Sequence, residues 1–394
     1  MPSVHISAKD LRPGMFIVAT ESSWHDRPYL YSKVGLIKSQ AEIDAILANG
    51  YVEAYYDPDR SFERPPNFSA SSDLLVSQAQ IKPPKATVPL VEEIKTAQVT
   101  YSDCLLHIKQ MLSEARHGTV DLPKSKKLVS NLVESLTRNQ DALAVISKIK
   151  TFDDYTYAHS INVAIFSIAF GLTLGLTGEV LSRLGQAAIF HDFGKMRIPK
   201  WILNAPRALK PEELAIVQNH PRLGAEMLEG VPALPKEIID GVLDHHEKYD
   251  GTGYPNRKKG SEISPFGRII SVADVYDALS TKRIYREAIS PNKALATMYS
   301  IRDQSWEPGL CETFIKMLGI YPVGSGVSLT MGYKGIVSES NYNAPLYPTV
   351  LLYCAPNGTT LKPPQAIDLS TQHDLQIVKA LPPNALNISL TDLL

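Results

Sequence analysis

Five of the ten histidines in this chain lie close together in the sequence and stand beside aspartates. They are His159, His191, His220, His245 and His246. Asp192 directly follows the second of them, and Asp274 comes shortly after the last. Histidine and aspartate are common ligands of divalent metal ions, and seven such groups exceed the needs of one tetrahedral ion. The set therefore predicts a site for two ions that share a bridging carboxylate.

The segment AIFHDFGKMRIP places His191 and Asp192 at the end of an apolar run, where we expect the buried end of a helix. Buried ionisable neighbours must be paired or bound to a metal to avoid a desolvation cost. Lys195 follows four residues after His191, which puts it on the same helical face. Its ammonium cannot bind a metal while it is protonated, but it can neutralise a substrate phosphate or stabilise a leaving group.

The pair His245-His246 runs into a glycine-rich turn, HHEKYDGTGYP. The glycines let the backbone turn sharply, and the final proline fixes its exit. We expect this turn to hold Tyr254 near the metals, where the side chain contacts the base or phosphate of a substrate. Glu247 leaves two options open: it orients a metal-binding imidazole, or it is a plain loop carboxylate.

Arg283 and Arg286 are three residues apart and face the same way on a helix or turn. They form either a solvated surface pair or contacts to a substrate, and the family resemblance described below implies the substrate contacts. Guanidinium groups recognise phosphates and guanine edges through paired hydrogen bonds. Asp277 shares a helical face with Asp274, where it can accept a hydrogen bond from guanine or position an arginine. The basic residues 257–259 are expected to form a solvated loop.

The elements that must position these residues are mostly helices with apolar residues at three- and four-residue spacing. We expect the chain to divide into a small N-terminal α/β domain, a proline-rich linker, connecting helices, a mainly helical domain with the histidines, and a small β subdomain, at residues 1–58, 59–90, 91–150, 151–320 and 321–394. The connecting helices either pack on the next domain or form a homodimer interface, and the sequence leaves both open.

Composition limits the partners and the compartment. The net charge of -1 favours neither nucleic acid nor acidic membranes as a partner. Three widely separated cysteines indicate a reducing compartment, and the first residues lack the pattern of a signal peptide, so we expect a cytoplasmic protein. The most apolar stretch, residues 161–178, is interrupted by polar residues and glycines, which favours a buried core helix over a membrane span.

The order of the histidines and aspartates resembles that of the HD superfamily of metal-dependent phosphohydrolases. The stretches HSINVA, HDFGK, HHEKYDGTGYP and RIISVADVYDALSTKRIYR together resemble its HD-GYP subfamily, over about residues 151–320. The N-terminal VHISAKDLRPGMFIV resembles an uncharacterised domain often found ahead of HD-GYP domains. The fold class implied is a multi-domain, mainly α protein, with an HD-type helical bundle as its catalytic core.

The resemblance implies a phosphodiesterase that hydrolyses the bacterial second messenger cyclic di-GMP to pGpG, to GMP, or to both. It makes all seven residues above ligands of two ions, iron or manganese, with Asp192 as the bridge and Lys195 as a phosphate contact in catalysis. A hydroxide between the two ions is the implied nucleophile. Some relatives bind a third ion through a glutamate whose position is Tyr155 here, so we expect two ions.

Three alternatives stay open beside cyclic di-GMP hydrolysis. The first is hydrolysis of cyclic GMP-AMP, which the sequence does not separate from the leading interpretation. The second is a catalytically weak receptor for a cyclic dinucleotide, which the complete set of ligand positions disfavours. The third is a general nucleotidase, which the GYP segment and the arginine pair disfavour.

Overall fold

The computed structural model of the chain describes residues 4–12, 15–18, 30–31, 34–37, 40–49, 51–57, 86–115, 121–149, 155–281, 289–372 and 374–381. The chain divides into two compact units, Met1–Ala79 and Gln80–Leu394. Most of the predicted linker lies outside the described residues.

The N-terminal unit is a small sheet with one α-helix. Its strands are β1 (Val4–Ser7), β2 (Phe16–Ile17), β3 (Leu30–Tyr31), β4 (Gly35–Leu36) and β5 (Glu53–Asp57). They follow the order β1-β5-β2-β4, and β3 pairs with β5 in parallel. The 3-10 turn η1 (Ala8–Asp10) follows β1, and helix α1 (Gln40–Ala48) buries Ile43 and Ile46 in the core of this unit. The predicted α/β character is confirmed.

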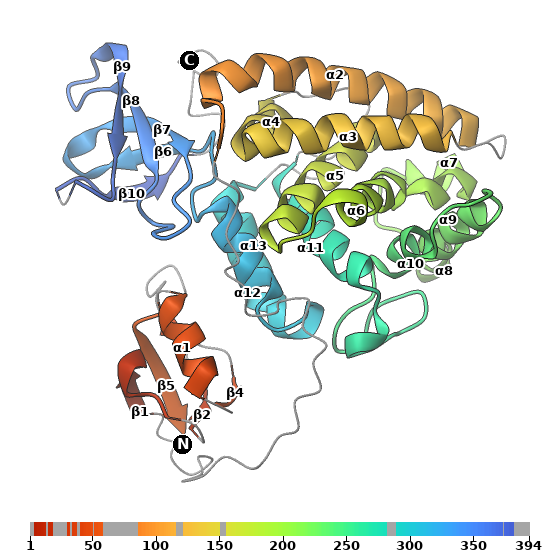
Figure 1. Ribbon diagram of the computed structural model, residues 1–394, viewed down its shortest axis with the longest axis horizontal. Coiled ribbons are helices and arrows are strands. Elements are labelled where there is room, and N and C mark those ends of the chain that lie inside the picture. The colour runs from red at the N-terminus through yellow and green to blue at the C-terminus, as the bar shows by residue number, and fades with distance from the viewer. Residues whose placement is uncertain are drawn as a thin grey trace. The chain divides into compact units, whose positions relative to one another are not determined.

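The second unit begins with helices, which are drawn from orange to cyan in Figure 1. These are α2 (Leu90–Ala115), α3 (Leu122–Arg138), α4 (Gln140–Ile149), α5 (Tyr155–Thr173), α6 (Gly178–Phe190), α7 (Lys200–Leu203), α8 (Pro211–Val217), α9 (His220–Glu229), α10 (Lys236–Asp244), α11 (Pro265–Ser280), α12 (Pro291–Ser305) and α13 (Leu310–Leu318). Two short 3-10 turns, η3 (Phe193–Arg197) and η4 (Gly260–Glu262), stand between them.

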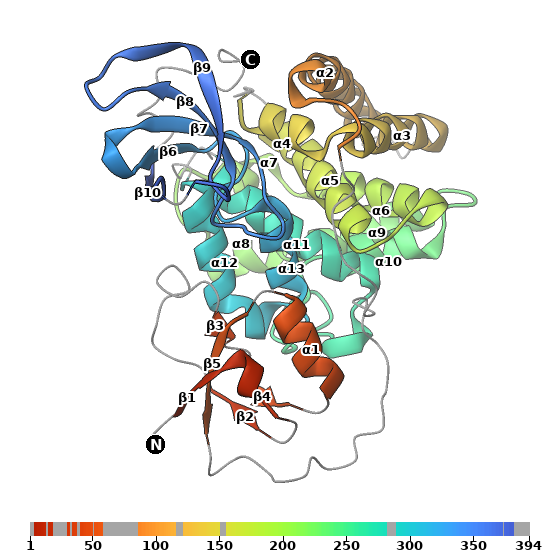
Figure 2. The ribbon, with the colours of Figure 1, turned by 60° about the vertical axis from the view of Figure 1, so that its left-hand side comes forward.

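Helix α5 lies at the centre of the helical part. Its residues 158–170 are all buried, as expected for a helix that is apolar on nearly every side. It packs against α6 and α11 and also against α2, α3 and α4 (Figures 1 and 2). None of the described helices combines the length and the apolar character needed to cross a membrane.

The connecting helices pack on the histidine-bearing helices. At the start of α3, the side chain of Asp121 accepts a hydrogen bond from the backbone N–H of Lys124 and caps the helix. Gln186 of α6 donates a hydrogen bond to the buried Ser125 hydroxyl of α3, at 2.9 Å. Of the two roles left open by the sequence, packing on the next domain is therefore observed, and the homodimer interface stays a prediction.

The last described elements form a second antiparallel sheet, drawn in blue in Figures 1 and 2. Its strands are β6 (Gly326–Leu329), β7 (Lys334–Glu339), β8 (Thr349–Cys354), β9 (Thr360–Asp368) and β10 (Ile377–Ala380), in the order β10-β6-β7-β8-β9. The 3-10 turn η5 (Thr330–Gly332) lies between β6 and β7. The predicted fold class, mainly α with small sheet domains at both ends, is confirmed.

Helix α4 meets this sheet at Asp141. Its carboxylate accepts a hydrogen bond from the backbone of Ser340 and lies near Glu339. Burial and the neighbouring Glu339 raise the pKa of Asp141 to about 7. A carboxyl group of the helical part therefore contacts the C-terminal sheet in surroundings that raise its pKa.

Candidate metal centre

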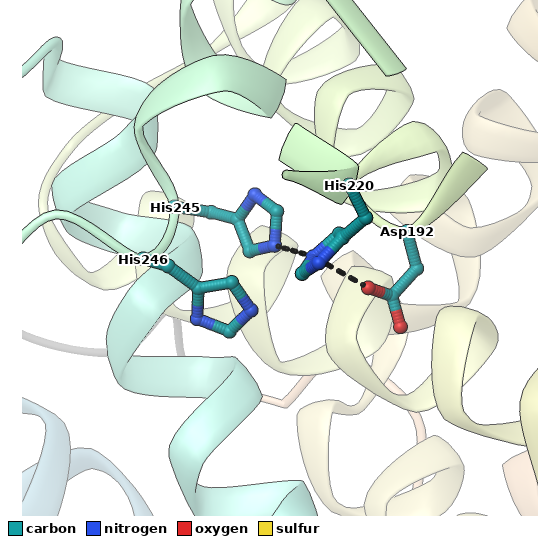
Figure 3. A group of neighbouring side chains, drawn as sticks. All are labelled: Asp192, His220, His245 and His246. Carbon is teal, nitrogen blue, oxygen red and sulfur yellow. Dashed lines mark hydrogen bonds and ion pairs between the residues drawn. The ribbon is translucent and has the colours of Figure 1, made fainter. Parts of the chain in front are cut away.

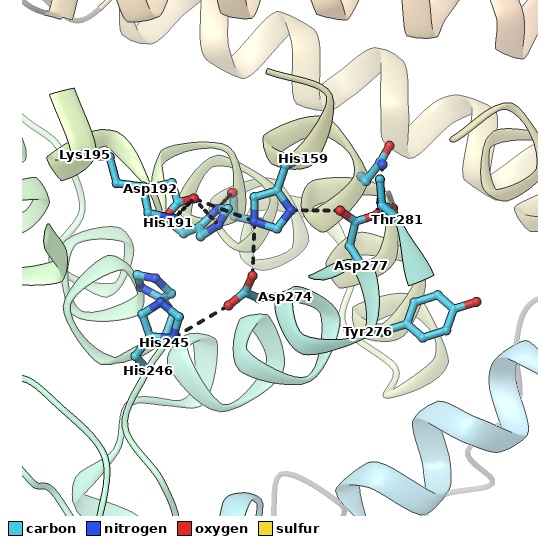
Figure 4. A network of polar contacts seen from close by, with 12 residues as sticks. His159, His191, Asp192, Lys195, His245, His246, Asp274, Tyr276, Asp277 and Thr281 are labelled. Atoms are coloured by element: carbon cyan, nitrogen blue, oxygen red, sulfur yellow. Dashed lines mark hydrogen bonds and ion pairs between the residues drawn. The ribbon is translucent and has the colours of Figure 1, made fainter. Parts of the chain in front are cut away.

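The predicted metal ligands come from five places in the sequence and lie together inside the helical part (Figures 3 and 4). His159 is on α5, and His191 and Asp192 link α6 to η3. His220 begins α9, His245 and His246 follow α10, and Asp274 is on α11. All are buried except His246, whose side chain is 22% exposed.

A first group of possible ligands contains Asp192, His220, His245 and His246 (Figure 3). One side-chain nitrogen or oxygen from each lies within 4.8 Å of those of the others. His220 Nε2 is 3.2 Å from Asp192 Oδ1 and 3.2 Å from His245 Nε2. Ligands placed about 2.1 Å from one ion are themselves about 3–3.5 Å apart, so these separations fit a common ion.

A second group contains His159, His191 and Asp192 (Figure 4). Asp192 Oδ2 is 3.7 Å from His159 Nε2 and 3.5 Å from His191 Nε2. Asp274 Oδ1 adds a further carboxylate oxygen, 3.1 Å from His159 Nε2. Asp192 is thus common to both groups, the position expected for a bridging carboxylate.

Three of the imidazoles are oriented by the same backbone contact. His191, His220 and His245 each place Nδ1 2.7–2.8 Å from the carbonyl oxygen three residues earlier in the chain. A carbonyl oxygen only accepts hydrogen bonds, so Nδ1 carries the proton and Nε2 keeps its lone pair. The lone pairs therefore point into the cluster, as metal ligation requires.

Two buried atoms of the cluster make no hydrogen bond among the described residues. They are His191 Nε2 and Asp192 Oδ1. A buried polar atom without a partner costs free energy, and a bound cation would supply the missing partner. The residues present therefore fit a divalent metal site.

The site's electrostatics support neutral imidazoles at His245 and His246. Burial and neighbouring imidazoles hold the pKa of His245 well below its usual range. Burial lowers the pKa of His246 to about 3, against the opposing effect of Asp274. Both side chains are therefore unprotonated at neutral pH and available as ligands.

The pKa values of Asp192, Asp274 and His159 shift in the direction that favours the charged form of each group. Burial would raise the pKa values of Asp192 and Asp274, but both values are held well below the usual range. Lys195, His191 and His220 outweigh burial at Asp192. His159, His246 and His191 do so at Asp274. Burial would lower the pKa of His159, but its hydrogen bonds to Asp274 and Asp277 raise the value to about 9. The carboxylates thus attract a cation to this position, where a metal ion would displace the proton of His159.

Gly194 explains how the HDFGK segment reaches α9. A Cβ at this residue would collide with the backbone carbonyl oxygen of His220 and approach the backbone of Gly224. Only glycine therefore allows η3 to pack closely enough on α9 to bring Asp192 beside His220.

Lys195 lies at the site, but not for the predicted reason. Helix α6 ends at Phe190, and Lys195 lies on the 3-10 turn η3, so the helical-face argument is wrong. Its ammonium donates a hydrogen bond to Asp192 Oδ2 at 2.6 Å and is 28% exposed. The lysine is thus both a partner of the shared carboxylate and accessible from solvent.

Comparison with known proteins agrees with this geometry. Residues 127–309 match the family described as HD domain, and residues 3–121 match a domain of unknown function (DUF3391). The chain is 32% identical over 366 residues to a protein of Pseudomonas aeruginosa named cyclic di-GMP phosphodiesterase, with 92% of this chain and 88% of that protein covered. This chain belongs to the HD-GYP family.

Two further relatives share shorter regions with this HD-GYP protein. A cyclic di-GMP phosphodiesterase response regulator of Xanthomonas campestris is 32% identical over 216 residues, which cover 54% of this chain and 56% of that protein. A 3'3'-cGAMP-specific phosphodiesterase of Vibrio cholerae is 34% identical over 200 residues, which cover 50% of this chain and 36% of that protein.

Asp277 of this HD-GYP site does not lie where a substrate contact was expected. It is fully buried, and its Oδ2 accepts a hydrogen bond from His159 Nδ1 at 2.8 Å (Figure 4). Its Oδ1 accepts hydrogen bonds from Asn162 Nδ2 and Thr281 Oγ1, each at 2.9 Å. The expected guanine contact is therefore corrected: Asp277 orients a predicted metal ligand from behind.

The loop that carries the GYP motif packs directly against the histidine pair. The Tyr254 backbone N–H donates to the His246 carbonyl oxygen, and the two rings lie 4.7 Å apart. Gly253 is needed because a Cβ there would collide with the backbone of Glu247 and Lys248. Tyr254 is half-buried beside the cluster, as the turn predicted.

Two acidic side chains hold this loop in place. Glu247 accepts hydrogen bonds from the backbone N–H groups of Asn256 and Lys258, at 2.7 and 3.0 Å, and so acts as a loop carboxylate. The Lys258 ammonium contacts the fully buried Asp244 carboxylate at 2.7 Å. The expectation of a solvated basic loop is therefore wrong for Lys258, although Arg257 and Lys259 are exposed.

Some predicted residues cannot be placed. Arg283 and Arg286 lie outside the described residues, and so does the Tyr155 side chain. The sequence did not predict the structural roles of Asp244 and Asn162. The available signal was the carboxamide of Asn162 in a largely apolar helix, because a buried amide needs hydrogen-bonding partners.

Proposed function

We propose that this chain is a metal-dependent phosphodiesterase that hydrolyses cyclic di-GMP to pGpG, to GMP, or to both. The names of the Pseudomonas and Xanthomonas relatives support this substrate. The proposal also includes two bound ions per chain, iron or manganese, because the ligands are imidazoles and carboxylates without cysteine.

The position of Asp192 is the observation that carries the proposal. Its carboxylate belongs to both ligand groups, which together offer imidazoles with lone pairs directed inward. His220, His245 and His246 would hold one ion with Asp192, and His159, His191 and Asp274 would hold the other. Such a site would supply Lewis-acid chemistry that activates water and neutralises phosphate charge.

The chain's own residues would then bind and orient the phosphodiester. Lys195 is placed to contact a phosphate oxygen, because its ammonium lies on Asp192 and is partly exposed. Tyr254 would place its ring or hydroxyl against the base or phosphate from the rigid GYP loop. Arg283 and Arg286 stay proposed contacts to phosphate or guanine, on the basis of their spacing and of the HD-GYP resemblance.

Cyclic GMP-AMP is the second candidate substrate, and the Vibrio relative supports it. Both molecules are cyclic dinucleotides and differ in one base. The residues of the metal centre would face the same phosphodiester in either case, so discrimination would depend on residues that contact the base.

The test is turnover of both cyclic dinucleotides by the full chain, loaded anaerobically with Fe(II) or Mn(II), with the products identified by chromatography. We expect hydrolysis of cyclic di-GMP with the higher kcat/KM and no turnover by Asp192→Asn. Faster hydrolysis of cyclic GMP-AMP would favour the second candidate. If the wild type binds both ligands as tightly as Asp192→Asn does and cleaves neither, the chain is a receptor instead.

We also infer a homodimer through α2. Val91, Val99 and Leu106 are 43%, 61% and 68% exposed, and their spacing puts them on one side of the helix. In an antiparallel pair of α2 helices centred on Val99, Lys95 of one copy would lie opposite Asp103 of the other, which pairs unlike charges. Sedimentation should give a dimer for the wild type and a monomer for Val99→Glu. A monomeric wild type would contradict this inference.

A further inference from the structure

A line of buried hydrogen bonds runs from helix α2 to the metal centre. The Tyr101 hydroxyl on α2 donates to Asn162 Oδ1 on α5 at 2.9 Å. Asn162 Nδ2 donates to Asp277 Oδ1 at 2.9 Å, and Asp277 Oδ2 accepts from His159 Nδ1 at 2.8 Å. Tyr101, Asn162, Asp277 and His159 are 0%, 1%, 0% and 3% exposed, so solvent does not compete for these bonds.

The donors and acceptors of this line can be arranged in only one direction. Asp277 is a carboxylate that accepts, so Asn162 must present its NH2 to it and its carbonyl oxygen to α2. That carbonyl oxygen then requires a donor, and the Tyr101 hydroxyl supplies it. Burial raises the pKa of Tyr101 above its ordinary value, which keeps this hydroxyl protonated.

The hydroxyl therefore fixes which way the Asn162 amide faces. Without it, the amide oxygen would be buried without a partner, and a rotated amide would turn that oxygen toward the Asp277 carboxylate. Either change weakens a hydrogen bond to Asp277, the group that holds the proton on His159 Nδ1. His159 Nε2, which faces Asp192 and Asp274, would then lose its fixed orientation.

We propose that Tyr101 is a positioning residue of the metal centre, which acts through Asn162 and Asp277 on the ligand His159. This rests on the proposed function, because it assumes that His159 binds a metal ion. Tyr101 belongs to the region that matches the domain of unknown function, residues 3–121, and not to the HD match at 127–309. Helix α2 therefore completes the metal site from outside the HD domain, and a shift of α2 would change the affinity for metal.

The test compares Mn(II) affinity, measured by calorimetry on the metal-free full chain, for wild type and Tyr101→Phe. Direct partners of metal ligands contribute about 10- to 100-fold in affinity, so a residue two contacts further away should contribute about three- to tenfold. Turnover at limiting Mn(II) should fall by the same factor, with KM unchanged, and excess Mn(II) should restore it. Tyr353→Phe is the matched control, because it removes a hydroxyl from a buried tyrosine in the C-terminal sheet.

A double-mutant cycle separates positioning from general loss of stability. In an Asn162→Leu background, which removes the amide but keeps its volume, Tyr101→Phe should have no further effect on Mn(II) affinity. If Asn162→Leu does not fold, Asn162→Ser serves as the background. Unchanged Mn(II) affinity in Tyr101→Phe, or an equal effect in both backgrounds, would overturn the inference while leaving the proposed function intact. A wild type that bound no Mn(II) would overturn both.

Discussion

Replacing Asp277 with asparagine distinguishes the two roles considered for this residue. The substitution keeps the shape of the side chain but puts an NH2 group where one carboxylate oxygen accepts hydrogen bonds. His159, Asn162 and Thr281 all donate to Asp277. Every orientation of the new amide therefore places a donor against a donor and breaks at least one of these bonds.

The expected loss follows from the position of Asp277 directly behind a predicted ligand. Partners of this kind contribute about 10- to 100-fold in metal affinity, which is about 1.4–2.8 kcal/mol. The assay is Mn(II) titration by calorimetry, together with steady-state hydrolysis of cyclic di-GMP. We expect weaker Mn(II) binding and an unchanged KM at saturating metal. Asp303→Asn, at a side chain that is 57% exposed, is the control and should change neither.

The opposite result would refute this reasoning. If Asp277 contacts guanine, as its helical spacing suggested, Asp277→Asn would raise KM for the cyclic dinucleotide and leave Mn(II) affinity unchanged.

Three further predictions concern the surroundings of the site. The folded-state pKa of Asp141 is raised to about 7, so ionising this buried carboxyl group costs the folded state a penalty that grows as pH rises from about 4 to 7. Asp141→Asn should therefore raise the free energy of unfolding by about 1–2 kcal/mol at pH 8 and leave it unchanged at pH 4. An equal effect at both pH values would contradict this. Lys258→Ala leaves the buried Asp244 carboxylate without its ion pair and should lower the free energy of unfolding in urea by about 3 kcal/mol, whereas Lys259→Ala should be nearly neutral. Tyr254→Phe keeps the ring beside the His246 imidazole and should keep the Mn(II) affinity. Tyr254→Ala should raise the KM for cyclic di-GMP about tenfold or more. An unchanged KM in Tyr254→Ala would show that this residue does not contact the substrate.

The sequence predicted the helices, the two small sheet domains and the types of residue that gather at the centre. These features depend on periodicity and on local pairs such as His191-Asp192, which are visible along the chain. The argument from a helical face failed for Lys195. Asp277 does share a face with Asp274, since both contact His159, but the guanine contact expected from that face is not observed. Helix α6 ends before Lys195, and α5 covers the side of α11 on which Asp277 lies.

The long-range partners could not be predicted. Lys258 and Asp244 are 14 residues apart, and Tyr101 and Asn162 are 61 apart, so no local pattern connects either pair. Each pair meets because helices pack in three dimensions, which propensity and spacing do not specify. The polar side chain of Asn162 within a largely apolar helix was the local sign of the hydrogen-bond network that joins it to Tyr101 and Asp277.

The most direct measurement is hydrolysis of cyclic di-GMP by metal-free protein reconstituted anaerobically with zero, one or two equivalents of Mn(II) per chain. We expect no turnover without metal, turnover that requires two bound ions, and none in a folded Asp192→Asn variant at any loading. Full activity with no metal, or undiminished activity in Asp192→Asn, would contradict a two-ion phosphodiesterase bridged by Asp192.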